Sequence, residues 1–206
     1  MGHREEKKRR IRAAIIENSI ALFRERGFDA TRVQDIARPL ELSDATFFNY
    51  FSTKDAVLTE WVQELLAEAF APVANARAER VRSVSRSAAR ALAARCGPDA
   101  KFLADIWPRV RQSAGSASPR VRELVAAGQA SGDLRGDLPA QQLADLLIAA
   151  MLMAIGSWLG NPSAGQPGQL GPRLQGAVDV VLDGSRKRNE RVRPPAARAP
   201  NSAPIA

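Results

Sequence analysis

The chain has 206 residues and a mass of 22.2 kDa, and its 45% hydrophobic and 25% charged residues are typical of a soluble globular protein. One cysteine, Cys96, and one histidine, His3, argue against a disulfide framework, a thiolate metal site and a histidine-based catalytic triad. We therefore expect no enzyme: no catalytic residues, no bound metal and no cofactor.

The net charge of +8 is concentrated at the two ends of the chain. Residues 1–12 carry +4 and residues 184–206 carry +5, so the body between them is nearly neutral. A basic end attracts DNA through counterion release, although such an end more often serves as a solubilising or disordered tail. Charge alone does not decide between these interpretations.

Helical patterns dominate the sequence, and signals for β-strands are nearly absent. The all-α prediction comprises about nine helices, with their caps near residues 5–26, 31–37, 44–50, 52–70, 76–95, 99–113, 119–131, 139–159 and 170–182. Gly27 ends the first helix, and Pro108 predicts a kink near Trp107. From Gly184 onward the chain is basic and rich in Pro and Ala, which predicts disorder.

Side chains that suit helix N-termini precede the short helices. Thr31 with Gln34 has the pattern of a capping box, and Ser43 is the expected N-cap of the next helix. Ser52 with Asp55 is expected to cap the helix after that.

The most apolar stretch of the chain is Leu146–Leu159. It has 14 residues, fewer than the ~20 that cross a bilayer, so we interpret it as part of a buried helix. The first residues lack the apolar run of a signal peptide. We therefore expect a cytoplasmic protein with no membrane partner.

Residues 31–51 have the layout of a helix-turn-helix, in which the second short helix enters the major groove of DNA. A seven-residue helix cannot bury the four aromatic residues between 47 and 51 on one side. Phe47 and Phe51, four residues apart, are the expected core pair. Phe48 and Tyr50 are then left for a groove or a phosphate. A compact aromatic core without function is the alternative.

About 50 residues carry a more specific pattern. It comprises Ile11–Gly27-Phe28, Thr31-x-x-x-Asp35-Ile36-Ala37 and Leu42-Ser43-x-x-Thr46-Phe47-Phe48-x-Tyr50-Phe51-x-x-Lys54-Asp55-x-x-Leu58. In these residues the chain resembles the TetR family of bacterial transcription regulators. The resemblance implies a helix-turn-helix domain over residues 1–53 with a basic arm at 1–10, a helical ligand-binding and dimerisation domain over 54–183, and a tail at 184–206.

The resemblance also implies which residues meet double-stranded operator DNA. Phosphate contacts are implied for Lys54 and for Thr31 and Arg32, and the arm from Lys7 to Arg12 would add nonspecific contacts. The residues implied to lie on or near the major groove are Ser43, Asp44, Ala45, Thr46, Phe48, Asn49 and Tyr50.

The chain departs from the family pattern at the turn and on the recognition helix. Leu40 and Glu41 stand where a small residue and Gly are usual, and Pro39 is expected to end the preceding helix early. Phe48 replaces a common tyrosine, which removes one hydroxyl contact. Asp44 would repel a phosphate but can accept a hydrogen bond from a cytosine amino group.

Two apolar helices near the C-terminus have two explanations: intramolecular core, or a four-helix interface between the subunits of a homodimer, as the resemblance implies. A dimer would place two recognition helices at half-sites ~34–36 Å apart. The residues expected in the interface are Leu143, Leu147, Ala150, Met151, Ala154, Trp158, Leu174, Val178 and Val181.

The resemblance further implies a cavity for a small-molecule effector. Each candidate lining residue is also a candidate for plain core: Trp61, Leu65, Phe70, Phe102, Ile106, Trp107, Val110 and Leu124. The arginines between residues 77 and 95 suggest either an anion site or a solvated helix face. Cys96 suggests either a redox sensor or an inert thiol.

Three functional hypotheses remain. The first is a dimeric, sequence-specific repressor that a small-molecule effector releases from its operator. The second is a DNA-binding regulator or activator without such an effector. The third is an enzyme or a helical interaction module, and the scarcity of His, Cys and Tyr argues against the enzyme.

Overall fold

The computed structural model describes residues 2–71, 81–113, 118–161 and 167–186. The described residues form no β-strand, which confirms the all-α prediction. Short 3-10 turns occupy Arg38–Leu40, Gly97–Asp99 and Pro167–Gln169. The helices are α1 (His3–Arg26), α2 (Val33–Ala37), α3 (Asp44–Tyr50), α4 (Lys54–Ala69), α5 (Val81–Cys96), α6 (Ala100–Ser113), α7 (Pro119–Ala130), α8 (Ala140–Leu159) and α9 (Leu170–Gly184).

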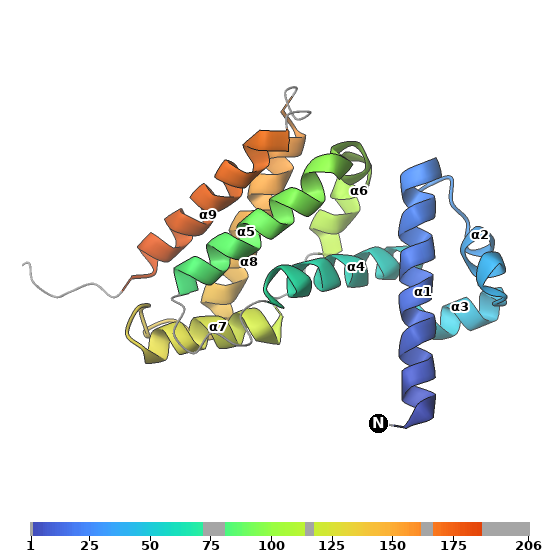
Figure 1. Cartoon of the computed structure of the whole chain (residues 1–206), viewed down its shortest axis with the longest axis horizontal. Helices are drawn as coiled ribbons and strands as arrows, with labels where there is room; N and C mark the ends of the chain where they lie inside the picture. Colours follow the sequence, from blue (N-terminus) through green and yellow to red (C-terminus); the bar gives the residue numbers. More distant parts are fainter. Residues whose placement is uncertain (1, 72–80, 114–117, 162–166, 187–206) are drawn as a thin grey trace, which may run out of the picture.

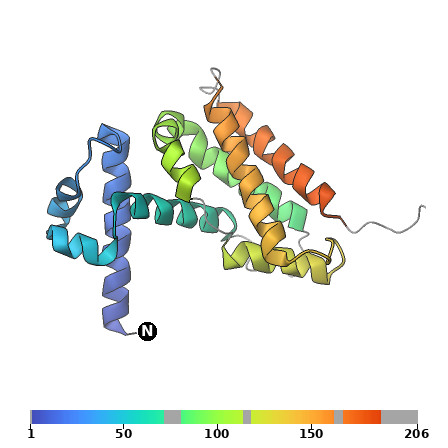
Figure 2. The same cartoon turned by 180° about the vertical axis from the view of Figure 1, so that it is seen from behind.

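Helices α1 to α3 lie at one end of the molecule, and α5 to α9 form a bundle at the other (Figure 1). Helix α4 runs between the two parts, and α2 and α3 lie on the side of α1 that faces away from the bundle (Figures 1 and 2). Helix α4 therefore belongs to both parts, because it packs on α1 as well as on α5 and α6.

The core of the N-terminal part is aromatic. Phe47 and Phe51 are fully buried with ring centroids 6.1 Å apart, which confirms them as the core pair of α3. Phe23 of α1 packs against Phe28 with centroids 4.8 Å apart. These rings hold α3 against α1, so that Phe48 is left facing outward with 52% of its surface exposed.

Two of the three predicted N-caps are displaced by one residue. Helix α2 begins after Arg32, whose backbone N–H donates to Asp35 Oδ2 at 2.9 Å, so the prediction of Thr31 with Gln34 is wrong. Thr53, not Ser52, caps α4 and accepts from the N–H of Ala56. Ser43 is confirmed, since its hydroxyl accepts from the N–H of Thr46 at 3.1 Å.

The turn between α2 and α3 contains two of the departures from the family pattern. Helix α2 ends at Ala37, and Pro39 lies in the 3-10 turn that follows, which confirms the early end. Glu41 has φ of 56°, in the left-handed region that glycine adopts without cost. A side chain there costs about 1 kcal/mol, so this turn is strained relative to one with Gly.

Helix α8 is the longest helix of the C-terminal bundle. Pro139 precedes it as the N-cap. In the described part of the chain it is the only helix long and apolar enough to cross a membrane, and 39% of its most apolar window is buried. Its neighbours α6, α7 and α9 cover one side, including Leu147 and Met151.

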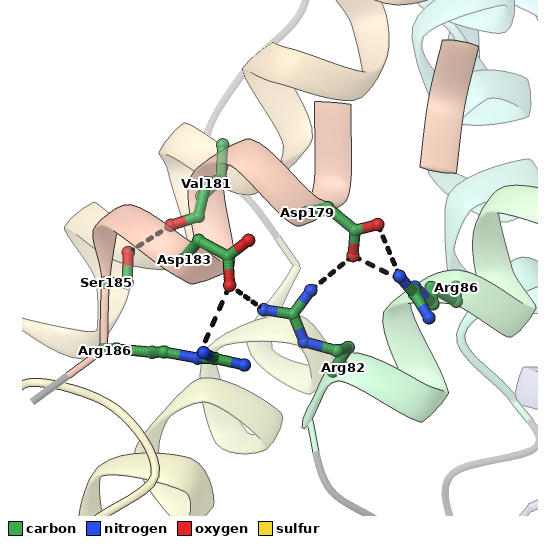
Figure 3. A network of polar contacts seen from close by, with 7 residues as sticks. All are labelled: Arg82, Arg86, Asp179, Val181, Asp183, Ser185 and Arg186. Carbon is green, nitrogen blue, oxygen red and sulfur yellow. Dashed lines mark hydrogen bonds and ion pairs between the residues drawn. The ribbon is translucent and has the colours of Figure 1, made fainter. Parts of the chain in front are cut away.

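An ion-pair network joins α5 to α9 (Figure 3). Arg82 and Arg86 contact the Asp179 carboxylate at 2.5 and 2.6 Å, and Arg82 also pairs with Asp183, which Arg186 approaches at 3.4 Å. The hydrogen bond from Arg86 lowers the pKa of Asp179. Two arginines of the suggested anion site are thus already paired with carboxylates.

Candidate nucleic-acid interface and effector cavity

The outer face of α3 presents most of the residues implied to lie on the major groove. Ser43, Asp44, Ala45, Phe48 and Asn49 are exposed, and Thr46 and Tyr50 are half-buried. Helix α3 itself lies beside α1, on the side away from the bundle (Figures 1 and 2). A short helix that displays small and polar groups with a protruding aromatic ring has the dimensions and chemistry for base-edge and backbone contacts.

Thr31 and Arg32 have opposite environments, although the sequence assigned both to phosphate. Thr31 is fully buried, and its hydroxyl donates to the carbonyl of Gly27 at 2.8 Å. In this conformation its side chain is not available to DNA and instead holds the loop before α2. Arg32 is exposed and remains a candidate for a phosphate contact.

Lys54 lies at the first position of α4 and is directed into the protein. Its ammonium donates to the carbonyls of Phe28 and Thr31 at 2.8 and 2.7 Å, and lies 4.4 Å from the centre of the Phe28 ring. Two of its three protons are thus committed to the loop between α1 and α2. The side chain ties the start of α4 to the start of the helix-turn-helix.

Lys54→Met is expected to lower the free energy of unfolding by about 2 kcal/mol, because two carbonyls lose a charged donor. Chemical denaturation of the variant measures this loss. Arg32→Ala is the control, with an unfolding free energy within about 0.5 kcal/mol of the unsubstituted protein and a shallower salt dependence of DNA binding. Unchanged stability of Lys54→Met with a shallower salt dependence would instead make Lys54 a phosphate ligand.

Phe28 is also held from the other side, by α6. Arg109 stacks on its ring at 4.3 Å and pairs with Asp29 at 2.6 Å and with Asp55 at 3.5 Å. Asp105 accepts from the backbone N–H of Phe28 at 3.3 Å. Sequence reasoning missed this junction, because it joins residues about 80 positions apart.

A small apolar cavity lies between α4, α5, α6 and α8. It encloses about 30 Å³, and every side chain that lines it is apolar or a thiol. The lining residues are Trp61, Val62, Leu65, Leu66, Leu92, Cys96, Leu103, Trp107, Val110, Leu152 and Ile155. Helix α6 therefore both lines this cavity and contacts Phe28 in the loop before the helix-turn-helix.

Four of the eight predicted effector residues line this cavity: Trp61, Leu65, Trp107 and Val110. Phe102 lines a separate surface cleft between α1 and α6 and packs against Trp61 with centroids 5.8 Å apart. Phe70, Ile106 and Leu124 are buried and do not line the cavity. The sequence did not predict the cavity-lining residues on α5 and α8, because their apolar pattern fits the core of a helical bundle equally well.

Gly156 of α8 lies against Trp107, one of the side chains that line the cavity. A Cβ atom there would lie 2.7 to 2.9 Å from three atoms of the Trp107 indole. The indole therefore rests directly on the backbone of α8, and this close approach keeps the cavity small.

Cys96 is expected to be an unreactive thiol in the native protein. Burial, with a smaller contribution from Asp99, raises its pKa to about 11 from 9.0, which lowers the thiolate fraction about 100-fold at pH 8. A disulfide reagent should label it slowly until denaturant opens the bundle. Cys96→Ser combined with Ala126→Cys, at an exposed site on α7, is the rapidly labelled control. Fast native labelling would contradict the prediction.

The same pKa shift has a consequence for stability. The unfolded chain loses the thiol proton near pH 9 and the folded chain near pH 11, so this group makes the unfolding free energy fall as pH rises between these values.

Most of the residues expected in a dimer interface are buried inside the subunit. Leu143, Leu147, Met151, Trp158, Leu174 and Val178 are at most 3% exposed. They lie in the core of the subunit and offer little surface to a second copy, so their assignment to the interface stays a prediction. Ala150, Ala154 and Val181 are half-buried and remain candidates. On α8 and α9 the large apolar side chains that face solvent are Leu146, Met153 and Val180.

The described residues contain no group of three or more His, Cys, Asp or Glu side chains that could hold a metal ion.

Comparisons with known proteins identify the N-terminal part. Residues 15–60 match the family model for bacterial regulatory proteins of the tetR family. The chain is 27% identical over 160 residues to the HTH-type transcriptional repressor DhaR of Mycobacterium sp. (strain GP1), which is 70% of this chain and 80% of DhaR. It is 38% identical over 56 residues to the HTH-type transcriptional regulator TcmR of Streptomyces glaucescens, or 27% and 25% of the two chains.

The whole fold is similar to that of solved regulators. The crystal structure of Thermus thermophilus FadR, a TetR-family transcriptional repressor in complex with lauroyl-CoA, superposes with a TM-score of 0.67 over 93% of this chain and 100% of FadR. The two sequences are 24% identical, so this likeness shows the fold. The helix-turn-helix and the helical bundle of this chain thus have the same arrangement as in a known fold.

Proposed function

We propose that this chain, whose residues 15–60 match the tetR family of bacterial regulatory proteins, is a transcription regulator rather than an enzyme, namely a dimeric repressor that a small-molecule effector releases from its operator. One observation carries the proposal: α6 contacts the apolar cavity with one face and the loop before the helix-turn-helix with the other. An effector that displaces α6 on entering the cavity would therefore also displace that loop.

The names of similar proteins support repression and effector binding. DhaR is named a repressor, and the FadR structure holds lauroyl-CoA. The cavity in this chain has no charged or hydrogen-bonding side chain other than a thiol and the two indoles. An effector with an apolar portion fits that lining, because burying a polar group there would leave it unpaired.

Dimerisation is supported by the apolar side chains that α8 and α9 leave in solvent. Met153 and Val180 are 68% and 74% exposed, and Leu146 is 49% exposed. Leu146 and Met153 are seven residues apart and so share one face of α8. Two copies joined through this face would form a four-helix interface and present two α3 helices to DNA.

Selection of binding sites from a random pool of DNA duplexes tests the proposal. A palindrome with half-sites about one helical turn apart is the expected result. Unselective binding that disappears at moderate salt would show that only the basic ends hold DNA, and would contradict it.

The second candidate is a regulator or activator without a small-molecule effector, and the small size of the cavity favours it. Thermal unfolding in the presence of a library of apolar compounds separates the two, since a ligand that binds only the folded state raises its melting temperature. Either regulator is expected to act in the cytoplasm.

A further inference from the structure

Arg12 belongs to the basic segment that the sequence assigned to DNA, yet it is directed toward the protein. Its Nε and Nη2 atoms donate to the two carboxylate oxygens of Glu60 on α4, and its Nη1 atom donates to the carbonyl of Tyr50 at 2.6 Å. Its guanidinium lies 4.2 Å from the centre of the Phe51 ring. By contrast, the basic side chains of residues 4–10 are exposed.

This contact set joins three helices at one point. Tyr50 is the last residue of α3. The carbonyls in the last turn of a helix accept no hydrogen bond from within that helix. The Arg12 guanidinium donates to the Tyr50 carbonyl and interacts favourably with the dipole of α3. Its planar fork also binds the Glu60 carboxylate through two hydrogen bonds. The hydrogen bonds that Arg12 donates to Glu60 also raise the pKa of Arg12.

We propose that Arg12 is a positioning residue that, together with Glu60, fixes the C-terminal end of the recognition helix α3 and does not itself contact DNA. The inference rests on the proposed function, namely that α3 reads the operator. Because α3 has only seven residues, a shift at its last carbonyl moves every base-facing side chain.

The two possible roles of Arg12 predict opposite effects of Glu60→Gln. If Arg12 binds phosphate, removal of a competing carboxylate frees the guanidinium, adds one positive charge and tightens binding to any DNA. If Arg12 positions α3, the same substitution loosens the helix end and weakens binding to the operator alone. The sign of the change therefore separates the roles.

The experiment compares the full-length variants Arg12→Gln, Arg12→Lys and Glu60→Gln on the selected operator and on a scrambled duplex between 50 and 200 mM salt. Melting temperatures confirm that each variant is folded at the assay temperature. Glu64→Gln is the matched control for Glu60→Gln, since it lies one turn further along α4 and removes the same charge. Arg10→Gln is the control for loss of an exposed basic side chain.

All three variants are expected to bind the operator about tenfold more weakly, while binding to the scrambled duplex and the salt slope change no more than in the matched charge controls. Arg12→Lys fails in this way because an ammonium lacks the planar fork. Glu64→Gln tightens binding to both duplexes slightly. Arg10→Gln lowers the salt slope by at most about one without altering the preference for the operator.

Three results would overturn the inference: tighter binding by Glu60→Gln, equal losses on both duplexes with a lower salt slope for Arg12→Gln, or lower melting temperatures with an unchanged preference for the operator. Asn49→Ala separates these from failure of the proposed function. If Asn49→Ala loses the preference and Arg12→Gln keeps it, only the positioning role fails. If the unsubstituted protein has no preference, the proposed function itself fails and the inference falls with it.

Discussion

Met153→Glu is expected to convert the protein to monomers and to weaken operator binding by about 100-fold or more, because a single recognition helix loses the gain from binding two half-sites at once. Met153 is 68% exposed in the subunit and lies centrally on the outward face of α8. In a two-fold interface the new carboxylates of both copies would be buried without cationic partners. Analytical ultracentrifugation and operator titration measure the two effects.

Ala126→Glu is the matched control for this substitution. Ala126 is exposed on α7, outside the face formed by α8 and α9, and receives the same charge. It should remain dimeric with unchanged operator affinity. If Met153→Glu stays dimeric, the subunits associate through another surface. If it becomes monomeric and binds the operator normally, dimerisation is not required for recognition.

Most residues predicted for the interface lie in the core of the subunit for a physical reason. Helix α8 is apolar on most of its circumference, so its periodicity identifies a helix but not which face meets another subunit. The side chains with the cleanest spacing, such as Leu147 and Met151, pack inside the subunit. Only the packing of α6, α7 and α9 on α8 shows that Leu146 and Met153 remain exposed to solvent.

Local features of the helix-turn-helix were predictable because they depend on neighbours in the sequence. The spacing of Phe47 and Phe51, the cap at Ser43 and the break at Pro39 all follow from residues within one turn. The cap of α2 lies one residue later than predicted. Thr31 suits an N-cap position, but Asp35 accepts from the backbone N–H of Arg32 and makes Arg32 the cap. Tertiary packing favours the later start, because it buries Thr31.

Long-range contacts account for the roles that the sequence did not predict. Lys54 reaches carbonyls 23 and 26 residues away, and Arg12 reaches partners 38 and 48 residues away. In both cases a basic side chain in a DNA-binding domain suggested a phosphate contact. The fold uses these charges to hold its own loops and helix ends, which no spacing rule indicates.

Phe28→Ala is expected to lower the free energy of unfolding by about 3–5 kcal/mol, because it removes a buried ring from the centre of the junction between the two parts. The ring is 3% exposed, packs on Phe23, and lies between the cations of Lys54 and Arg109. Denaturant unfolding measures the loss.

Phe28→Leu separates the two contributions of this ring, since leucine fills most of the space but offers no π face to either cation. It should retain the fold and the preference for the operator, at a cost of about 1–2 kcal/mol. Helix α6 would then hold the loop only through Asp105 and the ion pairs of Arg109. A compound that stabilises the protein should therefore release Phe28→Leu from DNA less effectively than the unsubstituted protein. Equal release by both proteins would show that α4, rather than α6, carries the signal from the cavity.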